Sequence, residues 1–167
     1  MAIYKIDGVD GDFHFPKKFV TMNITLAASG SISAGEWVAI DLDLSAAGGL
    51  GANVEESTTS LPQLVFGVAA ESITNSSSTD TLATTIKVQT AGKAENCAVE
   101  STVAAGDFLV ASTATAGRAV EVDSGTAVAG TSASDIQNAL KLARVGVALE
   151  AASSNLADCM IIDQGYF

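Results

Sequence analysis

The stretch SAGEWVAID at residues 33–41 has a near copy, AAGDFLVAS, at residues 104–112. In both stretches a small residue, Ala and Gly precede an acid, a large aromatic residue and an aliphatic run. Gly35 and Trp37 of the first stretch therefore align with Gly106 and Phe108 of the second. Gly beside an acid is typical of a turn, and aromatic and branched residues favour strands. Each stretch is predicted to be a turn that leads into a strand.

Further landmarks follow in the same order after each stretch. LPQLVFGVAAES at residues 61–72 matches LKLARVGVALEA at residues 140–151, where Gly67 and Gly146 are each followed by Val, Ala and then an acid, Glu71 or Glu150. Both copies close on an apolar strand that ends in glycine, TTIKVQTAG at residues 84–92 and DCMIIDQG at residues 158–165. The spacing between copies grows from 106 − 35 = 71 to 146 − 67 = 79, which places an insert at residues 124–135. The chain is therefore predicted to contain two similar β-units that share a core, because one unit alone would bury too little surface.

Composition agrees with short strands joined by many turns. Hydrophobic residues make up 48% of the chain, but aromatic residues only 5% and charged residues only 16%. Long amphipathic helices would need more Leu, Lys and Glu. We predict an all-β fold, an antiparallel β-barrel or sandwich built from two similar halves, with at most one short helix at residues 134–142.

The predicted domain organisation is an arm followed by one barrel-like domain. Residues 1–19 have no place in the repeat and form the arm, and residues 20–167 form the domain, with repeats at about residues 20–95 and 96–167. Trp37 and Phe108 occupy equivalent positions in the two halves. Both are predicted to be buried.

Charge and cysteine content exclude several classes of partner. The net charge is −11 and the eight Lys and Arg residues form no cluster, so nucleic acid is not predicted as a partner. No apolar segment approaches the length of a membrane span and the first residues do not look like an export signal, so no membrane partner is predicted. Cys97 and Cys159 form no CxxC motif, and both are predicted to be reduced, without a metal site or any other cofactor.

Catalytic groups are scarce, so the chain is not predicted to be an enzyme. It has one His and two separated Cys. Asp123, Ser124 and Gly125 resemble the Asp-Ser/Thr-Gly turn of aspartic proteases, which would require a dimer around Asp123 because those enzymes use two carboxylates. The same three residues also suit an ordinary hairpin turn. A dimeric aspartic protease and a surface module that binds a receptor or a sugar are the alternatives to a structural protein.

The repeated pattern resembles a family of small tailed-phage head decoration, or capsid cement, proteins that was long carried as a domain of unknown function. The residues that carry the resemblance are the two turn-and-strand stretches, the Gly-Val-Ala stretches at residues 66–69 and 145–148, and the final apolar strand at residues 160–162. The resemblance implies a β-barrel-like virion protein on the outer capsid surface. There it would bind the major capsid protein, stabilise the contacts between capsid subunits and associate with itself, most simply as a homotrimer.

The arm carries the residues predicted to form the interface with the capsid or with a neighbouring subunit. They are Phe13, Phe15, Lys17, Lys18 and Phe19. Aromatic side chains on a free arm would leave apolar surface that soluble proteins usually cover with a partner. An extended arm could bind by adding a strand to an exposed sheet edge.

Overall fold

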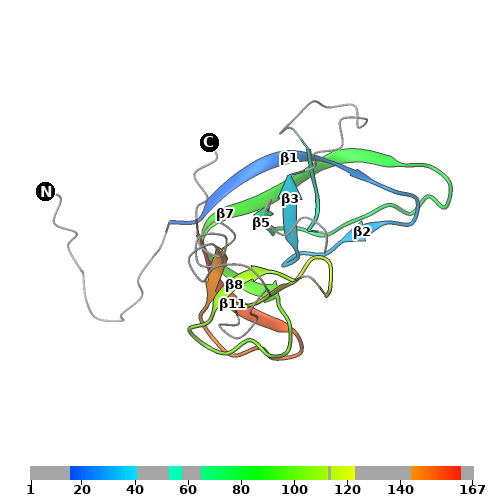
Figure 1. The fold of residues 1–167 in the computed structure, drawn as a ribbon. Coiled ribbons are helices and arrows are strands. Elements are labelled where there is room, and N and C mark those ends of the chain that lie inside the picture. Colours follow the sequence, from blue (N-terminus) through cyan, green and yellow to red (C-terminus); the bar gives the residue numbers. More distant parts are fainter. Residues whose placement is uncertain (1–15, 41–52, 58–64, 113, 123–143, 163–167) are drawn as a thin grey trace, which may run out of the picture.

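The computed structural model describes residues 16–40, 53–57, 65–112, 114–122 and 144–162 (Figure 1). All regular structure in these ranges is β-strand, which confirms the predicted fold class. The helix predicted at residues 134–142 lies outside the described residues. The strands are β1 (Lys18–Leu26), β2 (Ser31–Ile32), β3 (Trp37–Ile40), β4 (Asn53–Glu56), β5 (Val65–Ala69), β6 (Ile73–Thr74), β7 (Leu82–Ala98), β8 (Phe108–Ala111), β9 (Ala119–Glu121), β10 (Arg144–Ala148) and β11 (Leu156–Ile161).

The first half of the chain forms a closed five-stranded barrel. Its strands follow the order β1, β4, β3, β5 and β7, and the ring closes because β7 also pairs with β1. The pairs are antiparallel except for β1 with β4, which is parallel. The short strands β2 and β6 form a separate two-stranded sheet. We call this ring barrel one.

The second half forms an equivalent ring that shares β7 with the first. The order continues from β7 through β11, β10 and β8 to β9. β9 returns to the end of β7 through a parallel bridge between Ala119 and Val99, which corresponds to the parallel pair of β1 and β4. In Figure 1 the long green β7 runs from its place beside the blue β1 toward the orange and red strands of this second ring. We call this ring barrel two.

The two turns that open the repeat have the same backbone and the same hydrogen bonds. Gly35 and Gly106 have φ angles of 93° and 90°, a left-handed conformation that glycine adopts without strain. The Glu36 carboxylate accepts the Ser33 N–H at 2.7 Å, and the Asp107 carboxylate accepts the Ala104 N–H at 2.8 Å. The acid in each copy therefore stabilises its own turn, which explains why Gly followed by an acid recurs.

The residues in the middle of the two repeats also make equivalent hydrogen bonds. The Ala69 N–H donates to the Glu36 carbonyl at 2.8 Å, and the Ala148 N–H donates to the Asp107 carbonyl at 2.9 Å. Farther along, the carboxylates of Glu71 and Glu150 accept backbone N–H groups of β7 and β11, from Lys87 at 2.8 Å and from Asp158 at 3.1 Å respectively. The structure is thus built from two similar halves, as the spacing predicts.

Glycine at the centre of β5 and β10 allows neighbouring backbones to approach closely. A Cβ atom at Gly67 would lie 2.3 Å from the Gln89 carbonyl oxygen, and one at Gly146 would lie 2.7 Å from the Met160 carbonyl oxygen. In both strands the pairing with the other neighbouring strand shifts register beside this glycine. In the first copy the shift lies between Val38 and Ala39 of β3, which face β5. In the second copy it lies between Arg144 and Gly146 of β10. The close approach of the β7 and β11 backbones therefore explains the glycine in each copy.

The two cores differ in how they are filled. In barrel one the interior holds large side chains, including Phe66, Ile86 and Val88. The equivalent positions of barrel two carry the smaller residues Val145, Ala157 and Cys159. A core of small side chains leaves volume that another group must fill, because protein interiors are packed without large voids. That group is Trp37, which belongs to β3 of barrel one and lies in the core cluster of barrel two.

Candidate interaction surface

Trp37 joins the two barrels. Its side chain is fully buried, its indole N–H donates to the Ala98 carbonyl at 2.9 Å, and its ring edge lies 3.3 Å from where a Cβ atom of Gly146 would be. Val65 and Val68 of β5 lie in the same core cluster. The outer face of barrel one, at the centre of β3 and β5, is therefore covered by barrel two of the same chain.

The loop before β9 completes this contact. The Trp37 N–H donates to the Gly117 carbonyl and the Gly117 N–H donates to the Ser57 carbonyl, both at 2.9 Å. A Cβ atom at Gly117 would lie 2.7 Å from a carboxylate oxygen of Glu56. Burial, together with the nearby charge of Glu36, raises the pKa of Glu56 above its ordinary value. The barrel contact thus includes backbone hydrogen bonds as well as apolar packing.

The equivalent face of barrel two is only partly buried in the part of the chain that the structure describes. The strand pairing and the repeat spacing show which residues of the two barrels are equivalent: Trp37 and Phe108, Val65 and Arg144, and Val68 and Val147. The first three are exposed by 0%, 4% and 3%, whereas Phe108 is 45% exposed and the other two are half-buried. We call this face the outer strip. It consists of Phe108, Val110, Arg144, Val147, Met160 and Ile162.

The prediction that Phe108 is buried like Trp37 is wrong. Phe108 lies on the outside of barrel two, where the Arg144 guanidinium stacks over its ring at 4.2 Å from the centroid. A cation over an aromatic ring stabilises an exposed ring but does not remove it from water. The repeat therefore predicts the strand position correctly, and the tertiary contact made by only one copy decides the burial.

The predicted arm interface is described in part. Phe13 and Phe15 lie outside the described residues. Lys17 is exposed, with its ammonium group 3.9 Å from the Glu95 carboxylate, and Lys18 and Phe19 are exposed at the start of β1. The Phe19 ring is 40% exposed, and the Lys87 ammonium lies 4.4 Å from its centroid. Whether these side chains contact a partner stays a prediction.

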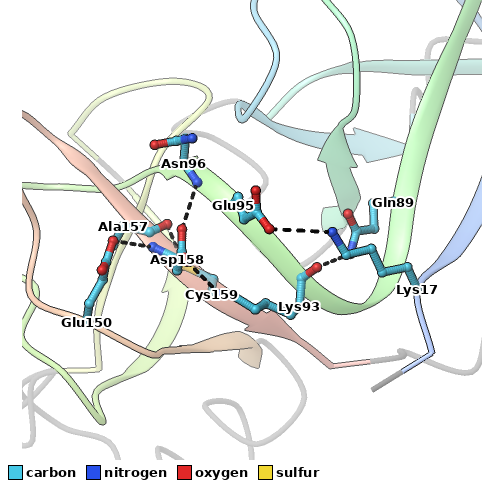
Figure 2. A network of polar contacts seen from close by, with 9 residues as sticks. All are labelled: Lys17, Gln89, Lys93, Glu95, Asn96, Glu150, Ala157, Asp158 and Cys159. Atoms are coloured by element: carbon cyan, nitrogen blue, oxygen red, sulfur yellow. Dashed lines mark hydrogen bonds and ion pairs between the residues drawn. The ribbon is translucent and has the colours of Figure 1, made fainter. Parts of the chain in front are cut away.

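The pair formed by Phe19 and Lys87 has an exact positional counterpart in barrel two. Phe19 pairs with Gln89, and Lys93 pairs with Met160, which is the residue of barrel two that is equivalent to Gln89. Lys93 therefore takes the position of Phe19. By the same spacing, Asp158 takes the position of Lys87. The Lys93 ammonium lies 2.9 Å from the Asp158 carboxylate, which also accepts the Asn96 N–H at 3.2 Å (Figure 2). A stacked ring and cation in one copy is therefore replaced by an ion pair in the other.

The ion pair gives a prediction about acid stability. The hydrogen bond from Lys93 holds the pKa of Asp158 below its ordinary value. A lowered carboxyl pKa contributes stability that is present above the unfolded value of about 3.9 and is lost as the pH falls through the folded value. We expect Asp158→Asn to lower the free energy of unfolding by less than about 1 kcal/mol near neutral pH, because the pair is partly exposed. In urea titrations this difference should shrink toward zero below about pH 4.

The matched control for that prediction is Glu95→Gln. Both partners in the contact of Glu95 with Lys17 are strongly exposed and 3.9 Å apart, so the change should alter stability by only a few tenths of a kcal/mol, about 0.3. A difference for Asp158→Asn that persists unchanged at low pH would contradict the assignment.

Within the described ranges, no three His, Cys, Asp or Glu side chains gather as a metal site would require. No helix with the length and apolarity of a membrane span occurs in the same ranges. Asp123, on which the protease alternative depends, lies outside the described residues. The outer strip was not predicted from the sequence, although the charge of Arg144 at the position of buried Val65 is a signal that this face of barrel two is not buried in the same way.

Comparison with known proteins overturns the predicted family. A family model described as "Cytomegalovirus glycoprotein N terminal" matches residues 61–87. The matched segment includes β5, β6 and the first part of β7. The matching model describes a viral glycoprotein and not a tailed-phage decoration protein, so the match contradicts the resemblance to capsid cement proteins, the function of stabilising a phage capsid and the location on a capsid surface. No curated protein matches the chain.

Proposed function

We propose that this chain is a non-enzymatic structural protein that works through protein–protein contact, and that its outer strip binds a second copy of the chain. One observation carries the proposal: the equivalent strip of barrel one is buried against a barrel of the same fold, within the same chain. The strip of barrel one therefore already binds a barrel of the same fold, namely barrel two of its own chain. A contiguous exposed apolar patch commonly marks a contact site.

Charge favours a second copy at this place over other parts of the surface. With a net charge of −11, two copies repel one another over most of their surfaces. The six residues of the outer strip include Arg144 and no carboxylate. The strip is thus a face on which two acidic copies can approach without placing acids opposite each other.

The match to a viral glycoprotein family supports a role at a viral surface, and it rests on residues 61–87 alone. A protein that acts by contact has no need of catalytic groups or of a cofactor. The homotrimer stays our proposal for the size of the assembly, and nucleic acid and membrane are not among the proposed partners.

The proposal is tested by changing the exposed ring of the strip. We expect Phe108→Ser to raise the dissociation constant of self-association by at least about tenfold, because buried aromatic residues dominate contact energies. Sedimentation velocity over a concentration series measures the constant, and light scattering gives the mass of the assembly. Since the ring is 45% exposed in one copy, the change should leave the monomer folded, as judged by its urea midpoint.

Leu149→Ser is the matched control. Leu149 is 44% exposed and lies beyond β10, outside the strip, so its removal deletes a similar apolar surface without changing the proposed contact. A parent protein that is monomeric at its highest soluble concentration would overturn the proposal. Equal weakening by both changes would assign the contact to general apolar surface instead of the strip.

A further inference from the structure

Two cysteines face the core of barrel two from neighbouring strands. Cys97 belongs to β7 and Cys159 to β11, and both are fully buried in the same core cluster. The strands are antiparallel, with Cys97 opposite Ala157 and Cys159 opposite Ala94. The register shifts between Ala157 and Cys159, so the two cysteines are diagonal neighbours across an irregular step of the ladder.

The two thiols influence one another. The interaction with the Cys159 thiol is the largest cause that raises the pKa of the Cys97 thiol. The Cys159 sulfur also lies 3.5 Å from the carbonyl oxygen of Ala157, the residue that pairs with Cys97 (Figure 2). The Cys159 sulfur is therefore directed toward the residue that pairs with Cys97 on the neighbouring strand. A disulfide holds its two sulfurs at about 2.05 Å, so the two side chains have to come together before the bond can form.

We propose that Cys97 and Cys159 form an intramolecular disulfide when the chain folds in the presence of a low-molecular-weight disulfide such as oxidised glutathione. The bond would join β7 to β11 across 159 − 97 = 62 positions of sequence. In the structure both cysteines are free, as the sequence predicts, and the proposal concerns folding under oxidising conditions. The inference concerns the core of barrel two and does not depend on the proposed self-association.

The exchange has two steps. One protein thiolate attacks a sulfur of oxidised glutathione, which forms a mixed disulfide and releases one glutathione thiolate. The second protein thiolate then attacks the protein sulfur of the mixed disulfide and releases the second glutathione. Overall, two protein thiols are oxidised to one disulfide, and one oxidised glutathione is reduced to two glutathione molecules that take up the two protons.

Burial decides when the exchange occurs. The hydrogen bond with Cys159 and burial raise the pKa of the Cys97 thiol, whereas the thiolate is the form that attacks a disulfide. Neither side chain is accessible in the folded barrel. The bond therefore forms while barrel two is still open, and a protein that has folded with reduced thiols resists oxidation.

The test refolds the full chain from the reduced, denatured state with either oxidised or reduced glutathione, followed by denaturation, alkylation with iodoacetamide and intact mass measurement. We expect the oxidised sample to carry no alkyl group and to be lighter than the reduced, unalkylated chain by about 2 Da, the mass of two hydrogens. Peptide mapping should recover Cys97 and Cys159 in one linked pair. Alkylation of both residues after oxidative refolding, or a separate glutathione on each, would overturn the proposal.

Two comparisons sharpen the test without relying on a variant that might not fold. Oxidised glutathione added to protein already folded in the reduced state should react at least about tenfold more slowly than during refolding, and an equal rate would overturn the proposed order of events. In Cys159→Ala, Cys97 has no partner in the chain. Oxidative refolding of that variant should give a mixed disulfide with glutathione, and full protection from alkylation without added mass would contradict the assignment.

Discussion

Trp37→Ala is expected to lower the free energy of unfolding by about 3–5 kcal/mol, the range for removing a large aromatic residue from a core. Two interactions are lost together, the packing of the indole in the core and its hydrogen bond. The indole fills barrel two, where the facing positions are small residues such as Ala157 and Cys159 that cannot close the gap. Its N–H also donates to the Ala98 carbonyl at 2.9 Å, which would be left without that donor. The loss is comparable with the whole stability of a small domain.

The equivalent position in barrel two provides the control. Phe108→Ala should cost no more than about 1 kcal/mol in the monomer, since the ring is 45% exposed and its main described contact is the stacked Arg144. Urea unfolding followed by far-ultraviolet circular dichroism measures both changes, because Trp37 is the only tryptophan of the chain and its fluorescence disappears with the substitution. Equal costs for the two variants would contradict the asymmetry of the barrels.

The repeat could be predicted from the sequence because its signals are local. Gly35 with Glu36, and Gly106 with Asp107, each specify a turn through a left-handed glycine and a carboxylate that accepts a backbone N–H three residues earlier. These interactions need only a few neighbouring residues, so they recur wherever the residues recur. The all-β class and the two similar halves follow from them and are confirmed.

The position of Gly92 shows where local reasoning fails. The sequence suggests that an apolar strand ends at this glycine, but the strand continues through it, and β7 runs from Leu82 to Ala98. Gly92 has a φ of 87°, and a Cβ atom there would lie 2.7 Å from the Pro16 carbonyl oxygen. The glycine allows the chain before β1 to cross β7 closely. This contact joins residues that are far apart in the sequence, so the local sequence pattern does not predict it.

The candidate surface was only partly predictable for the same reason. Lys17, Lys18 and Phe19 were assigned to a free arm, whereas Lys18 and Phe19 belong to β1 and pair with β7. The outer strip could not be predicted from the equivalence of Trp37 and Phe108, because equivalent strands have equivalent burial only when both make the same tertiary contact. One comparison within the repeat does carry the information: the buried Val65 corresponds to Arg144, and a charge at that position cannot be buried as Val65 is unless it is paired.

Gly35→Ala should be far more damaging than Gly106→Ala, although the two glycines occupy the same turn of the repeat. Both have φ near 90°, where any residue with a side chain is strained by about 1–2 kcal/mol. Gly106 has open space where a Cβ atom would be. At Gly35 that atom would lie 2.2 Å from the Asn96 carbonyl oxygen, which is backbone and cannot rotate away.

The clash at Gly35 falls on the contact between the barrels. The Gly35 N–H donates to the Ala69 carbonyl and its own carbonyl accepts the Ala98 N–H, both at 2.8 Å, so moving this turn disrupts β5 and β7 together. Overpacking of this kind adds about 1–3 kcal/mol to the backbone strain, for a total of about 2–5 kcal/mol against about 1–2 for Gly106→Ala. Urea midpoints of the two variants measure the difference. If Gly106→Ala proves as destabilising as Gly35→Ala, the turn of barrel two must also be covered, and the close approach of Gly35 to β7 would no longer explain the cost.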